Sequence, residues 1–155
     1  MEREYTIDHC LRATWQAVAK MYNEQAAKHE TTMATAMALL NIDAEKGTPS
    51  TALGPKMGME ATSLSRILKT MEKRGVIVKE PHKKDKRIVL VKLTDFGKIK
   101  REEAKITVLT FNNAVYNAIS EEKIKHFFEV TKAITTLIKN KEIYNQEIIT
   151  TKNKI

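Results

Sequence analysis

The sequence contains very little cysteine, proline and glycine. Its single cysteine, Cys10, excludes an intrachain disulfide framework and is compatible with a reducing cytosol. Only 3 prolines and 5 glycines occur among 155 residues, of which 42% are hydrophobic. This composition excludes collagen-like and low-complexity chains, and it favours a helical globular protein large enough to bury one core.

Long hydrophobic runs are also absent. The longest nearly apolar run, residues 33–40, is far too short to span a bilayer. Charged residues recur through the first twelve positions, so this segment does not resemble the apolar part of a signal peptide. We therefore expect a cytoplasmic protein that has no membrane partner.

The sequence lacks the common motifs of catalysis and metal binding. It has no phosphate loop, HExxH motif, glycine-rich dinucleotide turn or nucleophile elbow. Its four histidines include no pair spaced by four residues and have no cysteine partner. The acidic pairs at 102–103 and 121–122 fall in the first turns of predicted helices, where they complement the helix dipole. We expect neither an enzyme, nor a metal site, nor a cofactor.

Positive charge is concentrated in the middle of the chain. Residues 48–101 contain 14 Lys and Arg against 5 Asp and Glu, whereas the net charge of the whole chain is +8. Lys and Arg gathered on one face bind polyanions because they release counterions when they meet phosphates. An ordinary solvated basic face would give the same composition, so charge alone leaves both interpretations open.

Hydrophobic periodicity predicts long helices at both ends of the chain. In residues 5–28 the large apolar side chains are spaced by three or four positions, as on one face of an amphipathic helix. Thr94 is a natural N-cap for a helix that runs to about residue 117. Ser120, followed by two glutamates, begins a last helix with a broad apolar face.

Three further helices are predicted between these. A capping hydroxyl at residues 31–32 opens a second helix that ends near Gly47. A short third helix follows residues 48–51, and we expect it to begin late because Gly54 and Pro55 lie inside it. The fourth, over residues 60–74, shows a stripe of four apolar side chains: Leu64, Ile67, Leu68 and Met71.

A β-hairpin is predicted directly after the fourth helix. Gly75 ends that helix, and β-branched runs follow at residues 76–78 and 87–91. The stretch between them is rich in lysine. Two short strands joined by a basic loop form what is called a wing.

This order of elements is that of a winged helix-turn-helix, and residues 51–97 resemble the MarR (multiple antibiotic resistance regulator) family. The resemblance rests on five fragments in the right order, which are Leu53, residues 57–68 (MGMEATSLSRIL), residues 71–77 (MEKRGVI), residues 85–87 (DKR) and residues 93–97 (LTDFG). It implies a mainly α fold with a small β-hairpin wing. The winged helix-turn-helix domain would be flanked by long N- and C-terminal dimerisation helices.

The resemblance also implies a domain organisation and a function. We expect a single domain over residues 1–155, with a DNA-binding lobe at about 30–100 and a helical dimerisation lobe at about 5–28 and 103–145. The expected function is a sequence-specific, double-stranded DNA-binding transcriptional regulator that binds a pseudo-palindromic operator as a homodimer. In this family the default is a repressor released by a small aromatic or amphipathic ligand. The alternative is a winged-helix protein–protein interaction module without sequence-specific DNA binding.

The fourth helix and the wing supply the candidate DNA-binding residues. A recognition helix needs small polar side chains in its N-terminal turns so that backbone and base edges can approach. The candidates are Ala61, Thr62, Ser63, Ser65, Arg66 and Lys69 on the helix, and Lys83, Lys84, Lys86 and Arg87 in the wing. Arg66 either contacts guanine or clamps a phosphate. Arg87 either reads the minor groove or pairs with Asp85, the wing-stabilising candidate.

The family resemblance implies a dimer interface and a trigger. The interface candidates come from the first and last helices, and they are Leu11, Trp15, Phe127, Phe128, Ile134 and Ile138. Each of them is also a candidate for the core of the single chain. Cys10 is either a redox sensor or an inert interface thiol. His9 and Arg12 are the candidate cations beside it, and the sequence alone does not show whether they activate its thiolate. A ligand pocket near Met21, Met33 or Met37 is a further hypothesis.

Overall fold

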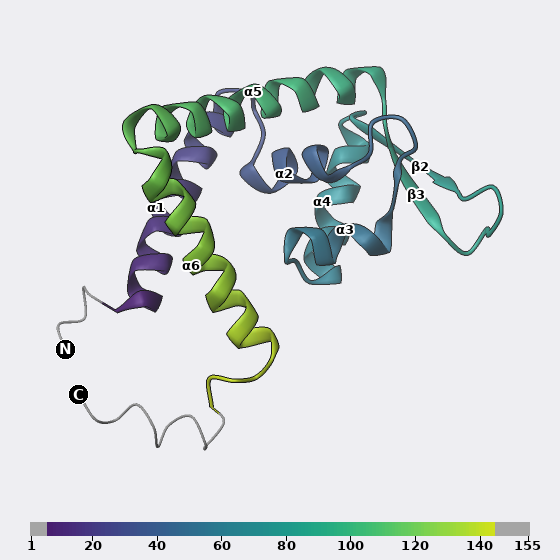
Figure 1. Cartoon of the computed structure of the whole chain (residues 1–155). Coiled ribbons are helices and arrows are strands. Elements are labelled where there is room, and N and C mark those ends of the chain that lie inside the picture. Colours follow the sequence, from purple (N-terminus) through teal and green to yellow (C-terminus); the bar gives the residue numbers. More distant parts are fainter. Residues whose placement is uncertain (1–5, 145–155) are drawn as a thin grey trace, which may run out of the picture. The chain divides into compact units, whose positions relative to one another are not determined.

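The fold is mainly helical with one small sheet, as the sequence predicts (Figure 1). The computed structural model describes residues 6–144, and within them it has six helices and three strands. The chain divides into two compact units at Leu109–Thr110. The helix α5 begins in the first unit and ends in the second.

The helices predicted at the ends of the chain are confirmed to within about two residues. The elements are α1 (Ile7–Ala27), α2 (Met33–Asn41), β1 (Thr48–Pro49), α3 (Ser50–Met57), α4 (Ala61–Lys73), β2 (Ile77–Pro81), β3 (Val89–Leu93), α5 (Asp95–Ala118) and α6 (Glu121–Lys139). Thr94 caps α5 as expected, because its hydroxyl accepts a hydrogen bond of 2.9 Å from the backbone N–H of Gly97. Within residues 6–144, no helix combines the length and apolarity that crossing a bilayer requires.

The predicted end of α2 near Gly47 is wrong, since the helix ends at Asn41. The cause is Asp43, whose carboxylate accepts hydrogen bonds from the backbone N–H groups of Glu45 (2.9 Å) and Lys46 (2.8 Å). An Asp that binds nearby backbone in this way offers an alternative to helical hydrogen bonds. Residues 43–47 therefore form a turn that leads into β1.

The predicted late start of α3 is also wrong. The helix begins at Ser50 and includes Pro55. Pro55 lacks only one N–H, and its ring is exposed to solvent. The helix then ends at Gly58, which has a φ of 61°, and the Met59 N–H donates to the Gly54 carbonyl at 3.0 Å.

The sheet has three antiparallel strands in the order β1-β3-β2. The predicted hairpin is confirmed, although β2 and β3 begin and end one to three residues later than the β-branched runs indicated. Strand β1 was not predicted, because a two-residue strand ending in Pro49 has no alternating pattern. It pairs Thr48 with Val91 and Pro49 with Leu90.

The hydrophobic core of the first unit joins α2, α3 and α4 to the sheet. Its largest fully buried side chains are Ile42, Leu53, Met71, Ile77 and Val91. The apolar stripe predicted on α4 faces this core, since Leu64, Leu68 and Met71 are buried and Ile67 is half-buried. The opposite face of α4 is therefore turned to solvent.

The second unit contains the end of α5 and all of α6. Ser120 is the N-cap residue of α6, and two glutamates occupy the first turn as expected. The same expectation for residues 102–103 is wrong, because α5 begins at Asp95 and these residues lie beyond its first turn. Ile124 is buried, whereas most of the other apolar side chains of α6 are exposed in the single chain. Among residues 110–144, this unit therefore has an exposed apolar surface on α6.

Candidate nucleic-acid interface

The solvent face of α4 carries all six candidates predicted on that helix. Ala61, Thr62, Ser63, Ser65, Arg66 and Lys69 are all exposed. Glu60, the N-cap residue, makes no side-chain capping bond, so the first backbone N–H groups of α4 have no side-chain partner there. A helix N-terminus with small side chains and open N–H groups favours an anion such as a phosphate.

The cations of this face are available for a partner. Among residues 6–144, neither Arg66 nor Lys69 forms an ion pair or a side-chain hydrogen bond. Glu72, one turn further along α4, instead binds Lys79 of β2 at 2.9 Å. That ion pair joins the end of α4 to the hairpin and leaves Arg66 and Lys69 without a carboxylate.

The loop of the hairpin is organised by Asp85. Its carboxylate accepts a hydrogen bond of 3.0 Å from the backbone N–H of Arg87, and its carbonyl accepts one of 3.0 Å from Ile88. The Arg87 Nε lies 3.7 Å from the same carboxylate, yet the Arg87 side chain is 95% exposed. Asp85 therefore fixes the loop backbone, while the Arg87 guanidinium stays open to solvent.

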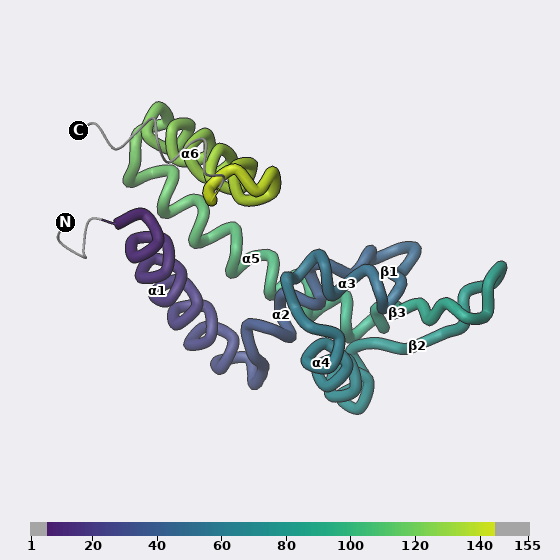
Figure 2. Tube along the Cα trace, turned by 90° about the horizontal axis from the view of Figure 1, so that it is seen from below, coloured from purple at the N-terminus to yellow at the C-terminus, as the bar shows by residue number. Residues whose placement is uncertain are grey.

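The wing lysines have no carboxylate partner in the described part of the chain. Lys83, Lys84 and Lys86 are exposed and form no ion pair there. At the base of the hairpin, Lys92 binds Glu80 at 2.7 Å. The β2–β3 hairpin projects from the helices of the first unit (Figure 2). We refer to Arg66, Lys69, Lys83, Lys84, Lys86 and Arg87 as the basic surface.

A cavity of about 410 Å³ lies within the first unit. It is lined by residues of α1, α2 and α5, and by Arg74 and Val76, which follow directly after α4. Met33 and Met37 line it, whereas Met21, the third methionine of the hypothesis, does not. Burial raises the pKa of the Tyr22 phenol at the cavity wall above its usual value.

Charged residues are also present in the cavity wall. Glu103 of α5 binds Lys100 at 2.9 Å and lies 3.4 Å from the His29 ring nitrogen. Within the described residues, the Arg74 guanidinium makes no ion pair. Sequence reasoning did not find Arg74, Lys100 or Glu103 as cavity residues. The spacing of Lys100 and Glu103 was the available signal, because residues three apart on a helix face one another.

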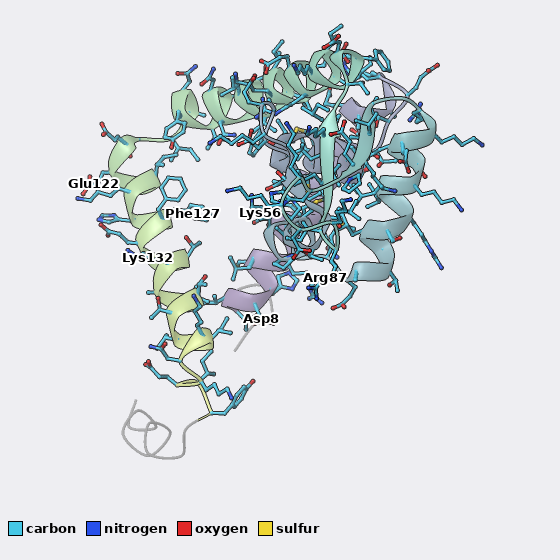
Figure 3. All side chains as sticks on the ribbon, turned by 90° about the vertical axis from the view of Figure 1, so that its right-hand side faces the viewer. Asp8, Lys56, Arg87, Glu122, Phe127 and Lys132 are labelled. Atoms are coloured by element: carbon cyan, nitrogen blue, oxygen red, sulfur yellow. The ribbon has the colours of Figure 1, made fainter. Side chains whose placement is uncertain are left out.

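The predicted dimer-interface residues lie on both units, and most are exposed. Leu11 and Trp15 of α1 are 41% and 53% exposed, and Trp15 also lines the cavity. On α6, Phe127, Phe128 and Ile138 are more than half exposed, and Ile134 is half-buried. The Phe127 ring projects from the α6 ribbon, and its centre lies 5.7 Å from that of Phe128 (Figure 3).

Cys10 lies on the surface of α1. Between residues 6 and 144, no group of three or more His, Cys, Asp or Glu side chains is arranged to hold a metal ion. The two alternatives for Cys10, a redox sensor and an inert thiol, both remain predictions.

Comparison with known proteins relates the chain to one family. Residues 31–89 match the model of the MarR family. The HTH-type transcriptional regulator SarZ of Staphylococcus haemolyticus (strain JCSC1435) is 29% identical over 87 residues, which are 56% of this chain. The match spans 59% of the length of that relative.

Two solved structures are similar in fold. The S. aureus MepR–DNA complex superposes with a TM-score of 0.78 at 16% identity, covering 86% of this chain and 100% of the other. The PcaV transcriptional regulator from Streptomyces coelicolor, in complex with its natural ligand, gives a TM-score of 0.75 at 20% identity. This match covers 88% of this chain and 96% of the other. SarZ and PcaV are regulators of transcription, in agreement with the prediction of a regulator rather than an enzyme. These comparisons confirm that the chain resembles the MarR family of winged helix-turn-helix transcriptional regulators.

Proposed function

We propose that this protein is a cytoplasmic, sequence-specific, double-stranded DNA-binding transcriptional regulator. The observation that carries the proposal is the solvent face of α4. Small polar side chains lie there at an open helix N-terminus, with two cations, Arg66 and Lys69, that form no ion pair within residues 6–144. α4 would lie in the major groove, with Thr62, Ser63 and Ser65 at base edges and Arg66 on guanine or phosphate. The wing would place Arg87 at the minor groove, with its three lysines near phosphates.

A homodimer is the second part of the proposal. The exposed apolar side chains of α1 and α6, among them Leu11, Trp15 and Phe127, support an interface with a second copy. A two-fold dimer would place two copies of α4 about one turn of DNA apart. The operator would then be pseudo-palindromic. The MepR–DNA complex, with its similar fold, is consistent with DNA binding by this fold.

The third part of the proposal is a repressor that a small aromatic or amphipathic molecule releases from DNA. The largely apolar cavity in the first unit supports it, because its wall combines aromatic and methionine side chains with Arg74, which forms no ion pair within residues 6–144. PcaV, which has a similar fold, has been solved with its natural ligand. A molecule that binds the cavity would lower DNA affinity if it binds the DNA-free conformation better.

The first test is binding to a fluorescent duplex taken from the region upstream of the protein's own gene. A scrambled duplex is the control, and both are titrated by anisotropy across a salt series. We expect the native duplex to bind at least about 1000-fold more tightly than the scrambled one, with affinity that falls steeply as salt rises. Equal weak binding to both duplexes would call for selection from random DNA before the operator can be named.

The alternative function is a winged-helix module that contacts another protein. It would not need unpaired cations on α4 together with a lysine-rich wing. Absence of salt-dependent binding to any duplex, including those selected from random DNA, would reject the regulator and favour this alternative.

A further inference from the structure

We propose that Thr94 is a positioning residue that couples the cavity to α4. A molecule in the cavity would change the position or mobility of α4 through this one residue. An effect of this coupling on DNA binding rests on the proposed function. The coupling itself involves only residues of the first unit.

The cavity touches both sides of the junction that Thr94 occupies. Arg74 is the C-cap residue of α4, and Val76 follows two residues later. On the other side, Phe96 and Lys100 lie in the first two turns of α5. A bound molecule would therefore contact the end of α4 and the beginning of α5 at the same time.

Thr94 connects these two ends with three hydrogen bonds. Its hydroxyl donates to the Gly75 carbonyl at 2.6 Å and accepts from the Gly97 N–H at 2.9 Å. Its backbone N–H donates to the Val76 carbonyl at 3.2 Å. A hydroxyl is needed because it serves as donor and acceptor at once, which neither a methyl group nor a carboxylate can do.

The junction leaves little room for movement of one side alone. Gly97 packs so tightly on Val76 that a Cβ at Gly97 would come within 1.9 Å of the Val76 carbonyl oxygen. The N–H groups of Gly75 and Val76 in turn donate to the carbonyls of Glu72 (3.0 Å) and Met71 (3.1 Å) in the last turn of α4. A displacement of α5 at this point would thus be passed to α4.

Two other connections join α4 to the elements after it: the core packing of Leu64, Leu68 and Met71 against the sheet, and an ion pair. The ion pair between Glu72 and Lys79 joins α4 to β2, with side chains that are 44% and 29% exposed. Exposed ion pairs contribute little and are screened by salt. The core contacts and the ion pair join α4 to the sheet, whereas the Thr94 junction joins α4 to α5, which lines the cavity. We therefore assign the coupling to Thr94.

The test uses the full chain, the fluorescent anion 8-anilinonaphthalene-1-sulfonate as cavity probe, and amide hydrogen exchange of residues 61–76 as readout. In the wild type, saturating probe should change exchange rates in this segment by about tenfold. Thr94→Ser retains the hydroxyl and should respond in the same way. Thr94→Val should bind the probe with unchanged affinity and lose the exchange response.

Two further variants exclude trivial explanations. Thr94→Asp keeps an acceptor for the Gly97 N–H, and so keeps the α5 cap, but its carboxylate cannot donate to Gly75. It should fold, bind the probe and lose the response even if Thr94→Val is too unstable to study. Ala104→Phe fills the cavity and should abolish both probe binding and the response.

The proposal is overturned if Thr94→Asp keeps the exchange response, if Thr94→Ser loses it, or if the wild type shows none with probe bound. It is also overturned if the response persists in Ala104→Phe. DNA binding is measured separately on the same samples. A wild type that shows the exchange response but binds no duplex would reject the proposed function and leave the Thr94 coupling intact.

Discussion

Gly97 and Val76 approach each other more closely than any residue with a Cβ would allow at position 97. A Cβ there would lie 1.9 Å from the Val76 carbonyl oxygen and 2.9 Å from its carbon. Gly97→Ala should therefore lower the free energy of unfolding by about 3 kcal/mol or more, because the backbone of the core must move. Urea denaturation followed by circular dichroism measures this loss.

The matched control is Gly58→Ala. Gly58 has a φ of 61°, but nothing lies within 4 Å of its missing Cβ. Its substitution should cost only the strain of a left-handed backbone, about 1–2 kcal/mol. If the free energy of unfolding fell by similar amounts in both variants, the backbone around Gly97 and Val76 would have to relax easily.

Arg66 is the clearest single test of the α4 surface. Because its guanidinium has no partner within residues 6–144, Arg66→Ala should leave stability nearly unchanged. It should weaken operator binding by about 10- to 100-fold, the range of one specific base contact. Anisotropy with native and scrambled duplexes separates the two possible roles, since removal of a phosphate contact weakens binding to both duplexes equally.

Lys20→Ala on the exposed surface of α1 removes the same charge outside the basic surface and serves as the control. If it weakened binding as much as Arg66→Ala, net charge rather than α4 would determine affinity.

The wing lysines should act through phosphates. Replacing Lys83, Lys84 and Lys86 together by Gln should reduce affinity for all duplexes alike. The plot of log affinity against log salt should also become less steep, its negative slope shrinking in size by about 0.9 for each phosphate that the wing no longer neutralises. A change in preference between duplexes, with the salt slope unchanged, would contradict the assigned role.

The parts of the fold that sequence predicts well are those in which a local pattern and the tertiary environment agree. The α4 stripe is one example, since Leu64, Leu68 and Met71 are all buried. Thr94 is another, because an N-cap depends only on the next three residues. The strand that was missed depends on distant residues. β1 exists because Thr48 and Pro49 meet β3, more than forty positions away.

The candidate site also has parts that follow from local sequence and parts that depend on distant residues. The exposure of Arg66 and Lys69 follows from helical periodicity, and these residues could be named in advance. The cavity could be named only in part, through Met33 and Met37, because residues from α1, α2, α5 and the end of α4 meet only in the folded chain. Glu103 shows the difficulty: its pairing with Lys100 is local, whereas its approach to His29 depends on how α1 and α5 pack.

Phe127 tests the proposed dimer. It is 56% exposed on α6, so a charge at this position should not unfold a single chain but should oppose burial against a second copy. We expect Phe127→Asp to shift the protein from dimer to monomer in sedimentation velocity. Glu122→Gln, an exposed polar change at the beginning of the same helix, should leave the dimer intact. A wild type that sediments as a monomer would refute the dimer.

Asp43 should give the protein an acid-sensitive contribution to stability. The backbone N–H groups of Lys46 and Glu45 bind its carboxylate and hold its pKa below the usual 3.8. A carboxyl group whose pKa is depressed in the folded state stabilises the protein at pH values above its unfolded-state pKa. This stabilisation disappears as pH falls through the folded-state pKa. The melting temperature of Asp43→Ala should be lower than that of the wild type at pH 7, and the difference should narrow below about pH 4. A constant difference from pH 7 to pH 2 would contradict this origin.

Both edges of the small sheet contain a proline. Pro49 ends the two-residue β1, and Pro81 ends β2, where Lys79 and Glu80 add charges. A proline offers no N–H to an incoming strand, and charged residues on an edge oppose the approach of another chain. The hairpin can therefore extend from the protein, as in Figure 2, while its edges resist the strand-to-strand pairing that leads to aggregation.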